Sequence, residues 1–248
     1  MQIACNPKNK RDSQSLANLS VSSWSHLDSY LKSNGLLFSK LKNYISASPI
    51  VLPTNNPLCS ATHCTTTELN VHIGGRSALE LLGLAHYLQV NTQETTVFVE
   101  SKTSLPLWFT NNQWDTNPKI FTASLLKESE IGLTDFQDGE LSIKIANATC
   151  AMMECLSLCP IQFPLVEAYE LMEGLTSLRP AQVQTLLEQC KSIKVKRLFL
   201  YFAERAGHRW FKYLDTKQID LGSGVRSLAN DGMFVSKYQL VLPKEIVQ

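Results

Sequence analysis

The spacing of apolar and polar residues changes along this chain and first indicates a β-rich middle zone. Residues 69–73 alternate apolar and polar side chains, as one face of a strand does. An amphipathic helix is predicted from Ser77 to Tyr87, and Glu80 lies at capping-box spacing from Ser77. Four further β-type runs are separated by polar or Gly/Asp-containing turns: TTVFVES, KIFTAS, IGLTDFQ and LSIKIAN. These runs predict a small, mostly antiparallel sheet covered by helices.

The zone after residue 158 has a helical spacing until near its end. Pro164 and Pro180 each stand where a helix begins, since the first turn tolerates a residue without an N–H. Gly174 and Gly207 stand where helices end. Between residues 193 and 206 the apolar positions leave only a narrow polar edge, which predicts a mostly buried helix.

The chain ends in a pattern that favours strands. Residues 219–221 and 237–242 are β-type runs, and Asn230-Asp231-Gly232 is a turn signal between the last two such runs. With the preceding zones this predicts an α+β protein. Its domain of residues 68–248 is a mixed α/β unit with short, mostly antiparallel strands.

Residues 1–67 have the least regular pattern. The strings WSHLDSYLKSNG and LFSKLKNYISAS predict two short amphipathic helices within residues 24–48, broken at Gly35. Such a pair is compatible with a helix-turn-helix, and any helical hairpin has the same pattern. We therefore expect a small helical N-terminal element, separate from the larger domain.

Charge is unevenly distributed although the chain carries a net charge of only +1. From Arg179 onward there are 12 Lys and Arg against 6 Asp and Glu, whereas the residues before it hold 11 basic and 16 acidic side chains. A basic C-terminal third indicates an anionic partner, or else an ordinary solvated face.

Two long strings resemble the AbiEi family of antitoxins from type IV toxin–antitoxin, or abortive infection, systems. They are LNVHIGGRSALELLGLAHYL and KVKRLFLYFAERAGHRWFKYLDTKQIDLGSGVRSLANDGMFVSKYQLVLP, and the resemblance covers roughly Leu69 to Pro243. It implies a bacterial transcriptional regulator that binds the operator DNA of its own operon. It also implies antagonism of a nucleotidyltransferase-like toxin, without implying that the two proteins touch.

The family also has an N-terminal winged helix, and the resemblance there is partial. SYLKSNGLLFSKLKNYISAS is similar to its middle, whereas PIVLPTNNPLCSATHCTTTE lacks an aromatic-glycine wing. The segment of residues 1–67 is thus expected to be a divergent, partial helix-turn-helix. A protein without this DNA-binding module would be a pseudo-antitoxin with a structural or partner-binding role.

Basic residues around the predicted buried helix are the candidate DNA contacts. Such side chains can neutralise phosphates without reading sequence, or they can flank an apolar helix and extend to water. With the family resemblance we expect DNA contact, and the candidates are Lys191, Lys194, Lys196, Arg197, Arg205, Arg209 and Lys212.

A second hypothesis is a nucleotide- or phosphate-handling enzyme. It rests on Gly74, Gly75 and Arg76, because free N–H groups at a strand-to-helix turn favour anions. The turn lacks the full glycine pattern and the Lys-Ser/Thr of nucleotide loops, and a tight turn is the ordinary interpretation. Histidines stand in no nucleophile motif. We predict no catalytic residue and no cofactor.

Cysteines and hydropathy bear on metals and location. Cys59, His63 and Cys64 lack a second ligand pair, and the spacing of Cys150, Cys155 and Cys159 does not bring all three together on a helix, so no metal site is expected. No apolar run reaches membrane-spanning length, and the first residues lack the apolar core of a secretory signal. Seven cysteines without framework spacing favour reduced thiols. We expect a cytoplasmic protein without a membrane partner.

Overall fold

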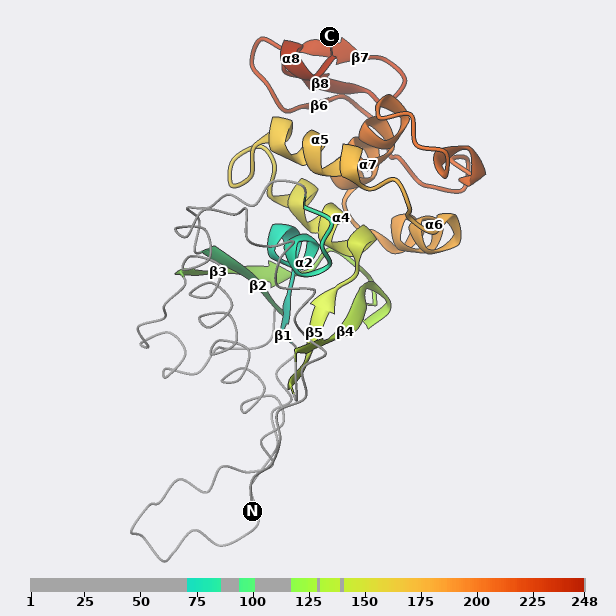
Figure 1. Ribbon diagram of the computed structural model, residues 1–248. Helices are drawn as coiled ribbons and strands as arrows, with labels where there is room; N and C mark the ends of the chain where they lie inside the picture. The colour runs from blue at the N-terminus through green and yellow to red at the C-terminus, as the bar shows by residue number, and fades with distance from the viewer. Residues whose placement is uncertain (1–70, 86–93, 101–116, 129, 139–140, 248) are drawn as a thin grey trace, which may run out of the picture.

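The computed structural model describes residues 71–85, 94–100, 117–128, 130–138 and 141–247. Figure 1 shows a sheet at one end of the described part, helices in the middle, and a second, smaller sheet at the end that holds the C-terminus. The predicted helices within residues 24–48 and the expected boundary at residue 67 lie outside the described residues.

The larger sheet has five strands in the order β3-β2-β1-β5-β4 among the described residues. β1 pairs antiparallel with β2 and parallel with β5, while β2–β3 is parallel and β4–β5 antiparallel. A single 3₁₀ turn, η2 (Glu130–Gly132), precedes β4. The strands are β1 (Val71–Ile73), β2 (Glu94–Glu100), β3 (Asn117–Ala123), β4 (Leu133–Asp138) and β5 (Leu141–Ala146).

The α+β class with short strands is confirmed, and the sheets are more mixed than we expected. β1–β5 and β2–β3 are parallel, and parallel strands cannot be joined by a two-residue hairpin. The alternation of apolar and polar side chains predicts where a strand lies. It does not predict whether the adjacent strand in the sheet runs parallel or antiparallel.

α2 lies between β1 and β2 in the chain, the other helices follow the five-stranded sheet, and the helices pack against the sheet and one another (Figure 1). Pro180 is the first residue of α6, Pro164 precedes α5, and Gly174 ends α5, as the sequence predicts. Gly207 follows α7 with a φ of 67°, which favours glycine. The helices are α2 (Gly75–Leu81), α4 (Ala148–Leu158), α5 (Leu165–Gly174), α6 (Pro180–Gln189), α7 (Ile193–Arg205), the 3₁₀ turn η3 (Phe211–Tyr213) and α8 (Lys244–Val247).

α4 and α7 form the centre of the core. Met152, Met153 and Leu156 of α4 are fully buried, and so are Phe199 and Phe202 of α7. A helix that is apolar on nearly all sides belongs in the interior, which explains why α4 lies between the five-stranded sheet and α7.

The C-terminal sheet pairs β6 (Arg226–Ser227), β8 (Leu240–Leu242) and β7 (Met233–Val235) in that order. The turn at residues 230–231 is confirmed. The predicted strand at residues 219–221 is wrong: this stretch is extended chain in which Ile219 is buried as an anchor. Its carbonyls accept hydrogen bonds from side chains of α7 instead of from a neighbouring strand.

Candidate functional site

Two of the predicted DNA-contacting residues on α7 lie inside the protein. Arg197 has only 2% of its surface exposed, and Lys196 is also buried. Arg197 Nε donates to the carbonyl of Leu221 at 2.8 Å, and its Nη1 donates to the carbonyls of Gly224 at 2.6 Å and Gln239 at 3.2 Å. Lys196 Nζ donates to the carbonyl of Asp220 at 3.1 Å. Both cations thus hold the C-terminal segment onto α7.

Lys194 is half-buried and contacts α4. Its Nζ donates to the carbonyls of Ser157 at 2.8 Å and Cys159 at 2.7 Å, at the C-terminal end of α4. A helix leaves its last carbonyls without partners, and a cation there also interacts favourably with the helix dipole. Burial lowers the pKa of the Lys194 ammonium. The side chain therefore caps α4.

Arg205, at the end of α7, is also engaged internally. Its Nη1 donates to the carbonyl of Val247 at 2.8 Å, and its guanidinium lies 5.4 Å from the centroid of the Tyr169 ring. A cation over an aromatic face is held electrostatically by the ring. Arg205 thus links the C-terminal helix α8 and α5 to α7.

At four of the seven positions expected to contact DNA, the charged group is engaged inside the fold. Lys194, Lys196, Arg197 and Arg205 bond to backbone carbonyls, and these bonds must break before the side chains can reach a phosphate. The snorkelling alternative does not describe them either, because their charged ends contact protein carbonyls. A basic residue beside an apolar helix can satisfy its donors inside the fold, and sequence alone does not distinguish these cases.

The other three predicted residues are exposed. Lys191 follows α6, and its backbone N–H donates to the carbonyl of Leu125 at 2.9 Å. Arg209 and Lys212 lie in the turn after α7. None of the three forms an ion pair with any residue that the structure describes.

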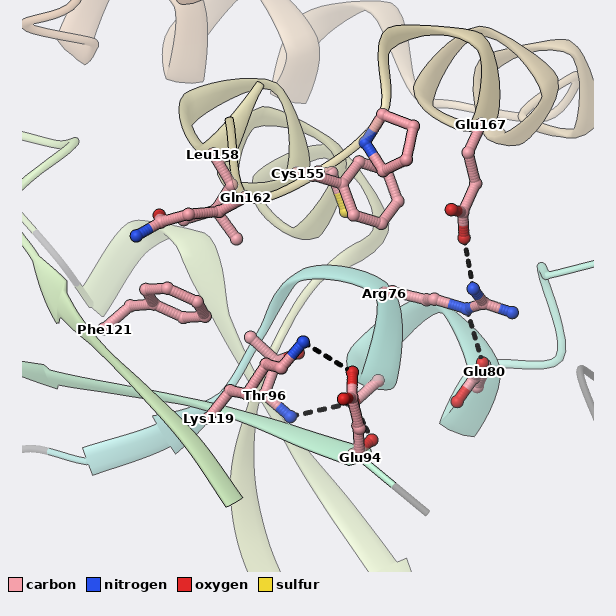
Figure 2. A pocket seen from close by; sticks show the side chains of 13 residues that line it. Arg76, Glu80, Glu94, Thr96, Lys119, Phe121, Cys155, Leu158, Gln162 and Glu167 are labelled. Carbon is pink, nitrogen blue, oxygen red and sulfur yellow. Dashed lines mark hydrogen bonds and ion pairs between the residues drawn. The ribbon is translucent and has the colours of Figure 1, made fainter. Parts of the chain in front are cut away.

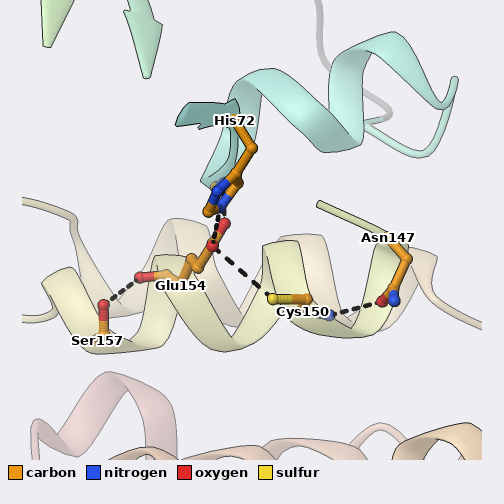
Figure 3. Close-up of polar contacts among 6 residues, drawn as sticks. His72, Asn147, Cys150, Glu154 and Ser157 are labelled. Carbon is orange, nitrogen blue, oxygen red and sulfur yellow. Dashed lines mark hydrogen bonds and ion pairs between the residues drawn. The ribbon is translucent and has the colours of Figure 1, made fainter. Parts of the chain in front are cut away.

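The Gly74-Gly75 turn is occupied by a carboxylate of the protein itself. Gly75 N donates to Glu154 Oε2 at 2.8 Å, and Glu154 Oε1 lies 2.7 Å from His72 Nε2 (Figure 3). The thiol of Cys150 donates to the same Oε1 at 3.7 Å. Glu154 reaches this position from α4 with 4% of its surface exposed.

This arrangement explains both glycines. Gly75 has a φ of 55°, and a Cβ added at Gly74 would lie 2.2 Å from Glu154 Oε2. A phosphate at the Gly75 amide would have to displace a buried carboxylate that also contacts His72. Glu154 occupies the place that the phosphate hypothesis requires.

The predicted capping box at Ser77 and Glu80 is wrong. Gly74 is the residue that precedes α2, and the hydroxyl of Ser77 accepts from the N–H of Thr96 on β2 at 3.0 Å. Glu80 accepts from Arg76 Nε at 2.8 Å. Ser77 therefore joins α2 to β2, and Glu80 contacts a neighbouring side chain of α2 itself.

A pocket of about 180 Å³ lies beside this turn (Figure 2). Arg76 projects between Glu80 of α2 and Glu167 of α5, and it is ion-paired to both. On the opposite side Lys119 of β3 pairs with Glu94 of β2 at 2.7 Å. Both cations of the lining are thus paired with carboxylates on their own side of the pocket, and Arg76 links α2 to α5 in place of the anion contact that the sequence suggested.

The described residues place no three His, Cys, Asp or Glu side chains where they could hold a metal ion. Cys150, Cys155, Cys159 and Cys190 are free and buried thiols. Burial raises the pKa of all four thiols, that of Cys159 to about 12. Cys59, His63 and Cys64 lie outside the described residues. No helix in the described ranges has the length and apolar character needed to cross a membrane.

The fold is that of an α+β protein of known architecture. It is similar to the crystal structure of the RV2827C protein from Mycobacterium tuberculosis, with a TM-score of 0.51 and 12% sequence identity. The match covers 69% of this chain and 61% of that chain, so this chain spans about three fifths of the length of the RV2827C protein. No curated protein matches the sequence.

A match to a protein-family model shows the family to which the chain belongs. The model described as transcriptional regulator, AbiEi antitoxin, type IV toxin–antitoxin system matches residues 92–243. The chain belongs to this family, which confirms the resemblance seen in the sequence. The matched range includes α4, α7, the turn with Arg209 and the C-terminal sheet.

Proposed function

We propose that this protein is the antitoxin of a type IV toxin–antitoxin system and represses its own operon by binding operator DNA. The observation that carries the proposal is the family match over residues 92–243. The toxin that it counteracts is nucleotidyltransferase-like, and the antagonism need not involve contact between the two proteins. A bacterial repressor must reach the chromosomal DNA, so we propose that the protein is cytoplasmic.

The geometry supports a regulator more than an enzyme. The most enzyme-like feature of the sequence, the Gly74-Gly75-Arg76 turn, is bonded to Glu154 and Glu167. A phosphate-handling role would need these internal bonds replaced by a ligand. Incubation with nucleoside triphosphates and Mg²⁺ is therefore expected to give neither turnover nor a shift of the melting temperature.

Rescue of growth tests the antitoxin proposal. The gene beside this one is expected to encode the toxin, and co-expression of the two is expected to restore colony formation that the toxin alone abolishes. Leu200→Asp is the control, because it places a charge at a fully buried position and unfolds the core. Soluble, folded wild-type protein that leaves the toxin fully active would contradict the proposal.

We further propose that residues 68–248 form the antitoxin domain and that residues 1–67 are a separate, divergent element. A fragment of residues 68–248 is then expected to be soluble and to rescue growth. Loss of operator discrimination on deleting residues 1–67, with the remainder folded, would show that the N-terminal element reads DNA sequence. Loss of rescue by a folded fragment would refute the domain assignment.

A further inference from the structure

The turn that follows α7 is anchored by two buried aromatic side chains. A ring N–H of His208 donates to the carbonyl of Met172 at 2.7 Å, and Trp210 Nε1 donates to the carbonyl of Leu175 at 2.8 Å. The two rings stack with centroids 5.0 Å apart. Both acceptors lie at the C-terminal end of α5, so the turn is fixed to α5 at two neighbouring points.

Hydrogen bonds of 3₁₀ type set the direction of the side chains in this turn. Phe211 N donates to the carbonyl of His208, and Leu214 N donates to that of Phe211, each at 3.1 Å. Residues three apart are aligned in such a turn. Phe211 and Leu214 pack on the core, while Arg209 and Lys212 are exposed.

An exposed aromatic side chain lies beside these cations. Tyr213 has 68% of its surface exposed, and Lys212 Nζ lies 5.0 Å from the centroid of its ring. Lysine and tyrosine side chains are both among those that bond to phosphate oxygens in protein–DNA contacts. Buried Trp210 and exposed Tyr213 thus have different roles although both are aromatic.

The chain beyond η3 presents a third cation, and its position is also fixed. Gln184 of α6 accepts from Asp215 N at 3.0 Å and donates to the Asp215 carbonyl at 3.1 Å. The carboxylate of Asp215 accepts from Lys217 N at 3.1 Å and from Gln218 Nε2 at 3.0 Å. The acidic group on this surface thus holds the turn, and the side chain of Lys217 stays exposed.

We propose that Arg209, Lys212, Lys217 and Tyr213, here called the 209–217 face, contact the phosphate backbone of double-stranded operator DNA. The proposal rests on the proposed repressor function and names the surface that carries it. The three cations form no ion pair with any residue within the described ranges. They position the DNA without reading bases, and the Tyr213 hydroxyl donates to a phosphate oxygen.

Three other exposed lysines make a matched control. Lys119, Lys144 and Lys237 are paired with Glu94, Asp135 and Glu204, so a phosphate would have to compete with a carboxylate at each position. Replacing these three lysines with Ala removes the same charge as replacing Arg209, Lys212 and Lys217. The comparison therefore separates a local contact from a change in net charge.

The test is fluorescence anisotropy with a duplex of the protein's own promoter at several salt concentrations. Each phosphate contact contributes about 0.9 to the slope of log affinity against log salt, so R209A/K212A/K217A is expected to flatten the slope by about 2.7. Between about 50 and 200 mM salt, the wild type should lose roughly 40-fold more affinity than this variant. The control K119A/K144A/K237A is expected to keep the wild-type slope.

Further variants and outcomes complete the experiment. R209Q/K212Q/K217Q retains long side chains and is expected to give the same flattening, and Tyr213→Ala is expected to weaken binding without changing the slope. A wild-type protein that fails to bind its promoter overturns the repressor proposal together with this inference. A wild type that binds, with the face variant and the control variant indistinguishable, overturns the 209–217 face alone.

Discussion

Replacing Arg197 with Met is expected to destabilise the fold and to leave the DNA contacts of the folded protein intact. Met fills a similar narrow space along the buried stem but has no donor for the carbonyls of Leu221, Gly224 and Gln239. Arg197 forms no ion pair with a residue that the structure describes, so its removal leaves no unpaired charge, but each buried carbonyl left without a donor costs about 1–3 kcal/mol. The carbonyls of Gly224 and Gln239 belong to exposed residues and can be rehydrated, so a total loss of about 3 kcal/mol is expected.

Thermal unfolding followed by circular dichroism measures this cost. For a domain of this size, a loss of about 1 kcal/mol lowers Tm by about 2–4 °C, so R197M is expected to melt about 6–12 °C below the wild type. Lys212→Met is the matched control, since it removes a cation from the surface and is expected to change Tm by less than about 2 °C.

DNA binding at a temperature where both variants are folded completes the test. R197M is expected to keep the wild-type salt slope, whereas Lys212→Met reduces it by about 0.9. An R197M protein with unchanged Tm and a flattened salt slope would refute the reasoning, because it would place Arg197 on phosphate instead of on carbonyls.

Three further predictions follow from buried and ion-paired groups. Lys194→Met removes the cation that caps α4 and is expected to lower the free energy of unfolding by about 1–2 kcal/mol, measured by urea titration; an unchanged midpoint would show that the cap is dispensable. With its pKa raised to about 12, Cys159 is expected to resist iodoacetamide near pH 8 until the protein unfolds, and peptide mass spectrometry would detect labelling of the native state. Burial opposes ionisation of Glu204, but hydrogen bonds from Lys237 and Tyr238 and the charge of Lys237 lower the pKa of its carboxyl overall. Because the folded pKa is below the unfolded one, this stabilisation is present at neutral pH and is lost as pH falls through the acid range. Glu204→Gln should therefore lose less Tm than the wild type on acidification, and equal losses would exclude this contribution.

Local signals in the sequence predicted much of the described fold. The strands β2 to β5 fall on the predicted runs, and α5, α6 and α7 begin or end at the predicted prolines and glycines. These signals succeed because strand alternation and helix termination depend on neighbouring residues. The prediction of a strand at residues 219–221 was wrong because the structure there depends on residues far away in the chain. The alternation reflects one buried residue, Ile219, and side chains of α7 donate hydrogen bonds to the carbonyls of this stretch.

The candidate site was less predictable because its contacts join residues far apart in the chain. Glycines at residues 74–75 indicated a tight turn, which the structure has, but nothing near them in sequence pointed to Glu154 as the occupant. A clue was nonetheless present for Arg197. The helix was predicted to be mostly buried, and a cation there needs acceptors inside the protein.

Seven basic residues of the C-terminal third thus belong to two groups with separate consequences. Lys194, Lys196, Arg197 and Arg205 hold α4, the C-terminal segment and α8 onto α7, and their charges are engaged by carbonyls. The cations of the 209–217 face belong to a turn that is fixed independently, through His208 and Trp210, to α5. Stability and DNA affinity should therefore vary independently between the two groups. A variant that changes both would show that the turn depends on the carbonyl bonds of α7 as well as on its own anchors.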